Sequence, residues 1–183
     1  MRIKLNNIKQ DNIILFDIEY DQNSLVQIAF LILCKIEPNI FELTKSFNVY
    51  IKQSHYLNNF FTRYTNITHR YLCDNGVDFP VAKAMVNEVV LNLDLNNTLI
   101  VSHGIKNDLK VLKENDIDLY KINNRYCTYD NAKKLLKRTK SLTLKDVAAE
   151  GCYYMFNEHN AYADVWGTLY AFSHLNKLEQ KEN

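Results

Sequence analysis

The pattern of apolar and polar positions predicts three strands in the first part of the chain. Residues 12–18 (NIILFDI) form a short run of β-branched and aromatic residues that is typical of a buried strand. A second run, SLVQIAFLILC at 24–34, follows the turn-like residues 21–23, and so short a connection indicates an antiparallel hairpin. Residues 44–51 (TKSFNVYI) are the third predicted strand.

The pattern then changes to alternating helices and strands. Residues 57–73 look helical in patches, and Pro80 stands early in the next helix, where its missing N–H costs little. Short strands are predicted at 98–103 and 125–128. Further helices are predicted at GIKNDLKVLKEN (104–115), DNAKKLLKR (130–138), TLKDVAAEG with Thr143 as cap and Gly151 as stop, and in the last segment from 159. This order predicts an α/β fold with a mixed five-stranded sheet flanked by helices.

Composition fits a single globular domain over residues 1–183. Of the residues, 47% are hydrophobic, and only four Gly and two Pro are present, so no segment resembles a flexible linker. The start of the chain lacks the apolar core of a signal peptide, and no apolar run is long enough to span a membrane. The four scattered cysteines have no CxxC spacing and suit a reducing cytosol, although two disulfides stay open. We therefore expect a cytoplasmic protein.

The net charge of +1 says little about partners, but its distribution is uneven. Residues 105–145 hold eleven Lys or Arg against five Asp or Glu. Such a region is able to meet phosphates, and an ordinary solvated helix face is the alternative.

Two acidic residues stand out in the first predicted strand. Asp17 and Glu19 are two positions apart, so their side chains project from the same face with Cα atoms roughly 6.5–7 Å apart. Two bare carboxylates at that range in a low dielectric repel each other, and a bound divalent cation would remove the repulsion. An exposed acidic face on an edge strand is the alternative.

Two predicted helices each bring one carboxylate to the border of their core-facing side. On a helical wheel Asp108 falls about 40° from Leu112, which belongs to the apolar stripe. Asp164 lies beside Val165 in the first turn of the last helix. The alternative for Asp108 is an early-turn residue favoured by the helix dipole.

His159 stands five residues before Asp164. On a continuous helix five residues correspond to about 140° of rotation, so the two side chains would diverge. They converge only if His159 lies in the loop before the helix, and Asn160 is a good N-cap for that arrangement. A loop histidine there titrates near neutral pH. A surface histidine before a cap is the alternative.

In order and spacing, three segments resemble the exonuclease motifs of the DEDD superfamily. They are DIE at 17–19, HGIKND at 103–108 and HNAYAD at 159–164. The chain is similar, from about residue 11 to 175, to the epsilon proofreading subunit of bacterial DNA polymerase III, ribonuclease T and oligoribonuclease. His five positions before the last Asp resembles the histidine branch (DEDDh). The chain departs from the family where Tyr20-Asp21-Gln22 replaces the frequent Thr-Thr-Gly.

The resemblance implies a ribonuclease H-like fold and a 3′–5′ exonuclease that releases nucleoside 5′-monophosphates. It implies that Asp17, Glu19, Asp108 and Asp164 bind two divalent cations, Mg²⁺ or Mn²⁺, and that His159 takes the proton of a water. If the first strand ends at Tyr20, its ring is expected to stack on a terminal base, and a core or surface tyrosine is the alternative. Leu25, Thr68 and His69 stand in the regions where the family lines its terminal-nucleotide pocket. His103 is expected to contact backbone, and a cap at the strand end is the alternative.

The expected partner is a single strand of nucleic acid with a free 3′ end, and no membrane. DNA proofreading or repair and RNA trimming or oligoribonucleotide degradation both fit, because the sequence has no discriminator between them. A nucleic-acid-binding module without catalysis is the third alternative, and the presence of all five key residues argues against it. Few residues follow the last predicted helix, so we expect a free-standing enzyme, with a homodimer left open.

Overall fold

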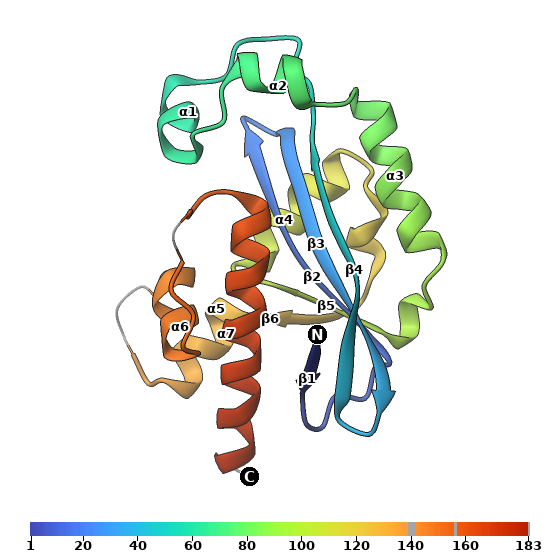
Figure 1. The fold of residues 1–183 in the computed structure, drawn as a ribbon, viewed down its shortest axis with the longest axis vertical. Helices are drawn as coiled ribbons and strands as arrows, with labels where there is room; N and C mark the ends of the chain where they lie inside the picture. The colour runs from blue at the N-terminus through green and yellow to red at the C-terminus, as the bar shows by residue number, and fades with distance from the viewer. Residues whose placement is uncertain (139–141, 156, 183) are drawn as a thin grey trace.

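Six strands form one mixed sheet in the computed structural model, which describes residues 1–138, 142–155 and 157–182 (Figure 1). The strand order is β1-β4-β3-β2-β5-β6. Consecutive antiparallel pairs join β2 (Asn12–Asp21), β3 (Ser24–Glu37) and β4 (Ile40–Tyr50). The shorter strands β5 (Thr98–Ser102) and β6 (Asn124–Cys127) continue the sheet in parallel to β2. The predicted hairpin and mixed sheet are confirmed.

The sheet has one strand more than the five predicted. The additional strand, β1 (Arg2–Lys4), pairs antiparallel with Ile40–Glu42 of β4. Three residues are too few to show an alternation of apolar and polar positions, so the sequence pattern gives no signal for this strand. β4 also begins four residues earlier than predicted, because its first part pairs with both β1 and β3.

The helices lie where the sequence pattern places them. Their bounds are α1 (Asn59–Thr65), α2 (His69–Asn75), α3 (Phe79–Leu91), α4 (Ile105–Glu114), α5 (Thr128–Leu135), α6 (Leu144–Glu150) and α7 (Ala161–Glu182), with 3₁₀ turns η1 (Leu95–Asn97) and η2 (Asp118–Lys121). The predicted cap of α6 is confirmed, since Thr143 and Asp146 form a reciprocal capping box. Gly151 ends that helix, also as predicted.

Both faces of β2 are buried, each against different helices (Figure 1). Ile14, Phe16 and Ile18 belong to the core that contains apolar side chains of α3 and α4. Ile13 and Leu15 belong to the core that contains the inner side of α7. A strand covered on both faces reads as a continuous apolar run, which is why residues 12–18 lack alternation.

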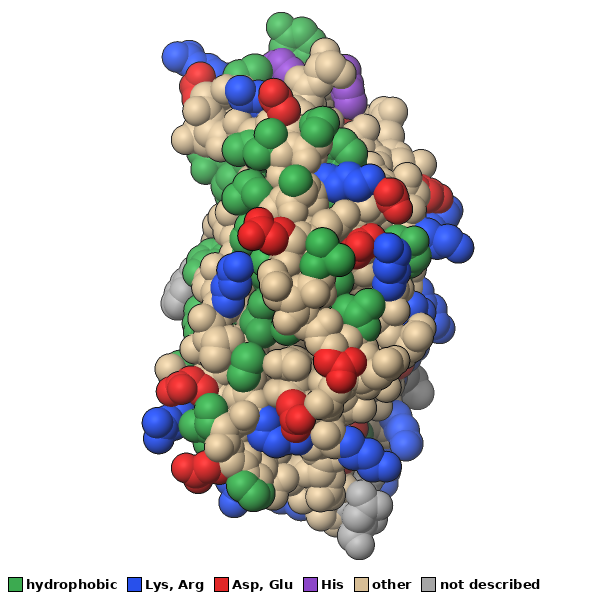
Figure 2. All heavy atoms as spheres, turned by 90° about the vertical axis from the view of Figure 1, so that its right-hand side faces the viewer, with side chains coloured by type: hydrophobic (Ala, Val, Ile, Leu, Met, Phe, Trp, Pro, Cys, Tyr) green, Lys and Arg blue, Asp and Glu red, His purple; other side chains and the backbone are tan. Residues whose placement is uncertain are grey.

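Surface charge is mixed. On the face around α3, basic and acidic side chains are interspersed with apolar ones (Figure 2). Several basic residues of 105–145 pair with nearby acids, as Lys110 does with Glu114 at 3.8 Å and Arg138 does with Glu150 at 2.6 Å. Lys140 of that stretch lies outside the described residues.

The described residues also bear on the predictions about disulfides and membrane-spanning segments. All four cysteines are free thiols, so the disulfide alternative does not hold. A search of the described helices finds none that is both long and apolar enough to cross a membrane.

Candidate active site

The site forms where β5 ends and β2 continues. β5 pairs with β2 only over Asn12–Leu15, and its last paired residue there is Val101. Asp17 and Glu19 therefore extend beyond the end of the neighbouring strand, on the side of the sheet that faces α7. Because β5 no longer fills the space beside them, the two carboxylates border an opening at the carboxyl ends of parallel strands, where ligands bind in α/β sheets.

Asp108 reaches this opening from the other side of the sheet. The chain leaves β5 at Ser102 and turns at Gly104, whose φ of 87° is a left-handed conformation that favours glycine. The turn starts α4, which packs on the α3 side through Ile105 and Leu109. The Ser102 hydroxyl donates a hydrogen bond of 2.6 Å to the Asp108 carboxylate and fixes its direction.

Asp164 and His159 come from the start of α7. Asp164 is buried in the first turn, and its Oδ2 accepts the His159 backbone N–H at 3.1 Å. His159 lies before the helix in a left-handed conformation with φ of 61°. His159 therefore lies in the loop before α7, as predicted.

Three carboxylates meet closely enough to share a cation. Ligand oxygens of Asp17, Glu19 and Asp164 all lie within 4.8 Å of one another. Burial raises the pKa of Asp17 well above its usual range, and the nearby charges of Asp108, Asp164 and Glu19 raise it further. Burial, followed by the charges of Asp164 and Asp108, raises the pKa of Glu19 to about 8. Asp108 thus belongs to the same electrostatic cluster.

The two helix-borne carboxyl groups are perturbed for the same reason. Burial raises the pKa of Asp164 to about 7, against the opposing hydrogen bond from the His159 backbone. Burial raises the pKa of Asp108 to about 6, against the hydrogen bond from Ser102. Four acids that are costly to ionise together fit a site for divalent cations, because carboxylate oxygens are preferred ligands of Mg²⁺ and the cation offsets their repulsion.

A cavity of about 310 Å³, here called the acidic cavity, adjoins this cluster. Asp17, Asp164 and His159 line it, together with Tyr64 of α1 and the first residues of α6. Its volume lies at the lower end of the range for small-molecule sites. Burial lowers the pKa of His159, so its imidazole is neutral at neutral pH.

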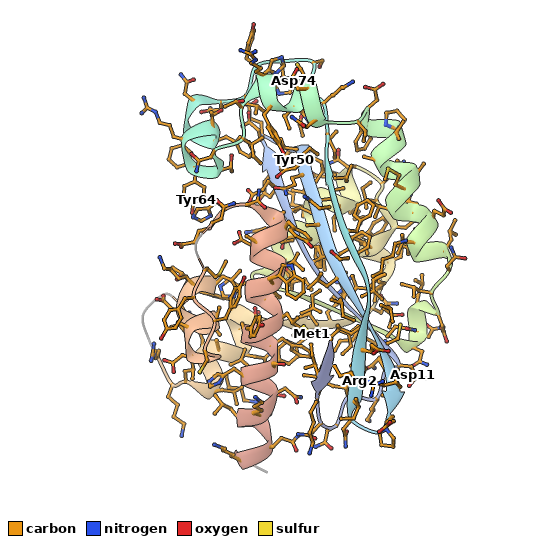
Figure 3. All side chains as sticks on the ribbon, viewed as in Figure 1. Met1, Arg2, Asp11, Tyr50, Tyr64 and Asp74 are labelled. Atoms are coloured by element: carbon orange, nitrogen blue, oxygen red, sulfur yellow. The ribbon has the colours of Figure 1, made fainter. Side chains whose placement is uncertain are left out.

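Tyr64 is a site residue that the sequence analysis missed. Its ring stacks on the His159 ring with centroids 3.5 Å apart, and it also stacks with the Phe60 ring, with centroids 5.8 Å apart. Figure 3 shows Tyr64 pointing from α1 toward the segment before α7. Both aromatic side chains are largely exposed, at 52% for Tyr64 and 74% for Phe60. Their i, i+4 spacing in a polar segment is the signal that sequence reasoning had available.

The five residues expected near the terminal nucleotide lie in different surroundings. Tyr20 borders a hollow shared with Glu19 and Tyr64, next to the irregular register that follows Glu19. His103 lines the acidic cavity. Its Nδ1 pairs with the Thr128 hydroxyl at 3.0 Å, and its Nε2 with the Leu142 carbonyl at 3.3 Å.

The other three residues do not line the acidic cavity. Leu25 is buried in the core on the α3 side. Thr68 caps α2 by accepting the Tyr71 N–H, and the His69 ring packs against Tyr56 with centroids 4.7 Å apart. Their roles at a nucleotide stay predictions.

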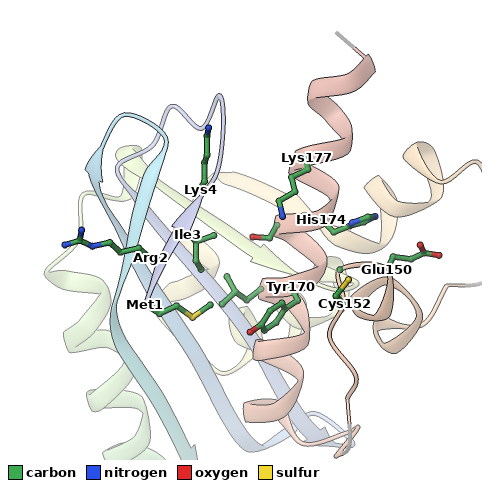
Figure 4. Close-up of a pocket in the computed structure, with 12 residues that line it drawn as sticks. Met1, Arg2, Ile3, Lys4, Glu150, Cys152, Tyr170, His174 and Lys177 are labelled. Atoms are coloured by element: carbon green, nitrogen blue, oxygen red, sulfur yellow. The ribbon is translucent and has the colours of Figure 1, made fainter.

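A second cavity, of about 390 Å³, lies between β1 and α7 (Figure 4). Its lining includes Lys4, Tyr170 and Lys177. The carboxylate among its lining residues is Glu150, which pairs with Arg138. Two of the three clustered carboxylates, Asp17 and Asp164, line the acidic cavity, so the candidate metal site lies there.

The family model described as exonuclease (RNase_T) matches residues 11–172, which include all five motif residues. The chain belongs to the exonuclease family. The resemblance to this superfamily is therefore confirmed, whereas the histidine branch stays a prediction. No curated protein sequence matches the chain.

Solved structures of nucleases share the fold. Exonuclease I of E. coli in complex with a dA16 oligonucleotide has a TM-score of 0.69 at 18% identity, covering 94% of this chain and 42% of that chain. A 3′-exonuclease solved in recognition of the 3′ end of a histone mRNA stem-loop has a TM-score of 0.67 at 13% identity, covering 93% and 83%. Cell-death related nuclease 4 has a TM-score of 0.61 at 16% identity, covering 94% and 65%. This chain thus spans less than half the length of exonuclease I.

Proposed function

We propose that this chain is a metal-dependent 3′–5′ exonuclease that removes nucleoside 5′-monophosphates from single-stranded DNA or RNA. The observation that carries the proposal is the convergence of Asp17, Glu19 and Asp164, whose ligand oxygens lie within 4.8 Å of one another. Membership of the exonuclease family supports it, as do fold relatives solved with a DNA oligonucleotide and with the 3′ end of an RNA.

Asp17, Glu19, Asp108 and Asp164 are the residues that would hold two divalent cations, Mg²⁺ or Mn²⁺. When bound, such ions activate water and stabilise the charge that develops on the phosphate and the leaving oxygen. The carboxylates contribute the negative charge that retains the cations, and the Ser102 hydroxyl keeps Asp108 directed at the site.

His159 is the candidate for the general base. It lines the same cavity as Asp17 and Asp164, and its lowered pKa leaves a ring nitrogen free to accept a proton at neutral pH. The hydrogen bond from its backbone to Asp164 holds the residue beside the acid cluster, and its imidazole ring stacks on Tyr64. The proton of an attacking water would therefore pass to this ring.

Exposed aromatic rings support a single-stranded substrate. Tyr64 borders both the acidic cavity and the hollow beside Glu19, and Phe60, whose ring stacks with that of Tyr64, lines the same hollow. Bases stack on such rings without regard to sequence, with about 1–3 kcal/mol for each base. A base inside a duplex is already stacked and paired, so an unpaired 3′ end fits this surface better.

Oligonucleotides labelled at the 5′ end test the proposal. Single-stranded DNA and RNA of matched sequence should shorten stepwise from the 3′ end with Mg²⁺ or Mn²⁺ and stay intact with EDTA, and nucleoside 5′-monophosphates should accumulate. Asp17→Asn should abolish the reaction while retaining the fold. Asp74→Asn, at an exposed position of α2, is the matched control.

Two outcomes would refute the proposed activity. One is an Asp17→Asn variant that keeps the wild-type rate, and the other is wild-type protein that is inert on every strand in the presence of either metal. The relative rates on DNA and RNA decide the substrate, and the mass in solution decides the homodimer, which stays a prediction.

A further inference from the structure

Gln27 is a fully buried polar side chain in the apolar strand β3. Its side chain has 0% exposure, and it stands directly opposite Glu19 in the pairing of β2 with β3. Directly opposite residues of an antiparallel pair share a face of the sheet, so Gln27 lies on the face that α7 covers. A buried amide is costly unless its donors and acceptors are paired.

The Gln27 amide is paired in three directions. Its Oε1 accepts the backbone N–H of Ala161, the first residue of α7, at 3.1 Å. Its Nε2 donates to Asn48 Oδ1 of β4 at 2.8 Å and to Asn160 Oδ1 at 3.4 Å. One side chain thus links two strands to the start of the helix that carries Asp164.

The same turn is tied to the acid cluster. The Asp164 N–H donates to the Asn160 carbonyl at 2.9 Å, and the Asp164 carboxylate accepts the His159 N–H at 3.1 Å. Asn160 Nδ2 donates to the Tyr50 hydroxyl at 2.9 Å, and Figure 3 places Tyr50 at the end of the sheet near this turn. Fixing residues 160–161 therefore fixes the two functional groups beside them.

Apolar contacts alone leave this turn less defined. α7 packs on the sheet through Val165, Leu169 and Phe172, and such contacts are not directional. Hydrogen bonds to a rigid strand restrict both the slide and the rotation of a helix end. A misplacement of about 1 Å at a reacting group costs up to about 100-fold in rate.

We propose that Gln27 is a positioning residue, which sets the first turn of α7 so that Asp164 meets Asp17 and Glu19 and His159 stays at the rim of the acidic cavity. The inference rests on the proposed function for its effect on turnover. Its effect on the turn itself and on cation affinity does not depend on any reaction.

Asn176 provides a matched control at the other end of the same helix. It is also buried, with 2% exposure, and it exchanges two hydrogen bonds with the backbone of Asn6, at 2.9 and 3.0 Å. Asn176→Leu and Gln27→Met are near-isosteric changes. Each removes a buried amide that links α7 to another segment, the backbone of Asn6 in one case and β3 in the other. The amide of Gln27 lies beside the acid cluster, whereas the amide of Asn176 lies near the opposite end of α7.

Three measurements test the proposal on wild type, Gln27→Met and Asn176→Leu. In metal-free protein, the Ala161 amide should lose hydrogen-exchange protection in Gln27→Met only. Mn²⁺ affinity, titrated by calorimetry, should fall by about 10- to 100-fold in Gln27→Met, as for other supporting residues around metal ligands. On a single-stranded oligonucleotide, kcat should fall by a similar factor while KM changes less than about threefold, because the stacking rings of Tyr64 and Phe60 belong to α1 and not to α7.

Equal Mn²⁺ affinity in Gln27→Met and Asn176→Leu would overturn the inference. Unchanged hydrogen-exchange protection of the Ala161 amide in Gln27→Met would overturn it too. If Gln27→Met does not fold, Gln27→Asn keeps a buried amide on a side chain one methylene shorter, which draws it back from the Ala161 N–H, and wild-type Mn²⁺ affinity in that variant would overturn the inference as well. Wild-type protein without any exonuclease activity would refute the proposed function, whereas the exchange and Mn²⁺ measurements would still decide the role of Gln27.

Discussion

Glu19→Gln should stabilise the metal-free protein at alkaline pH while removing its activity. The pKa of Glu19 is raised from 4.5 to about 8 by burial and by the charges of Asp164 and Asp108. Between these two values the folded protein binds more protons than the unfolded chain, so the free energy of unfolding falls as pH rises through this window. The neutral amide of glutamine has no such cost of ionisation.

The magnitude follows from the distance between the two pKa values. At about 1.4 kcal/mol for each pH unit, the full interval corresponds to about 5 kcal/mol at a pH above both values. Glu19 is partly exposed, so water screens its charge, and the remaining acids readjust their own ionisation when one charge is removed. We therefore expect a gain of about 2 kcal/mol in the free energy of unfolding.

Urea unfolding in EDTA at about pH 5 and about pH 9 measures this effect. The wild type should be less stable at the higher pH, and Glu19→Gln should reduce that difference by about 2 kcal/mol. Adding Mg²⁺ should stabilise the wild type more than the variant, because the cation needs the carboxylate. Glu88→Gln, at an exposed position of α3, is the control and should behave as the wild type. A variant with the same pH dependence as the wild type would refute the reasoning.

Three further changes probe other parts of the site and the fold. Tyr64→Ala should raise KM for single-stranded oligonucleotides by about tenfold through the loss of stacking, whereas Tyr64→Phe should keep the wild-type KM in steady-state assays. His159→Ala should lower kcat by about 100-fold or more and leave Mn²⁺ affinity within about threefold in calorimetry; an unchanged kcat would remove its role as base. Thr143→Ala should lower the free energy of unfolding by about 1 kcal/mol in urea titration through loss of the α6 cap, and an unchanged value would contradict the capping role.

The order of elements follows from local signals in the sequence. Apolar runs at 12–18 and 24–34, Pro80 early in α3 and the Thr143 capping box each act over a few residues, and all have their expected structure. β1 is the exception, because three residues have no periodicity of their own and are a strand only through pairing with β4.

The acids of the candidate site were predicted from spacing within elements and from the family resemblance. The strand period places Asp17 and Glu19 on one face, and the helix period places Asp108 and Asp164 beside the core. Tyr64 and Gln27 were missed, since an exposed tyrosine and a single glutamine in an apolar run are common. Tyr64 contacts His159, which is 95 residues away along the chain, and Gln27 contacts Asn160, which is 133 residues away. Their importance depends on these long-range contacts.

The sequence by itself determined which elements form and which residues are candidates for the chemistry, because backbone periodicity and capping are properties of short segments. Only the tertiary structure decided that β5 ends before Asp17, that helices from opposite faces of the sheet bring Asp108 and Asp164 to that opening, and that Tyr64 covers His159. These relations arise from long-range packing. The local pattern is compatible with many arrangements of the elements, and contacts between distant segments decide which one forms.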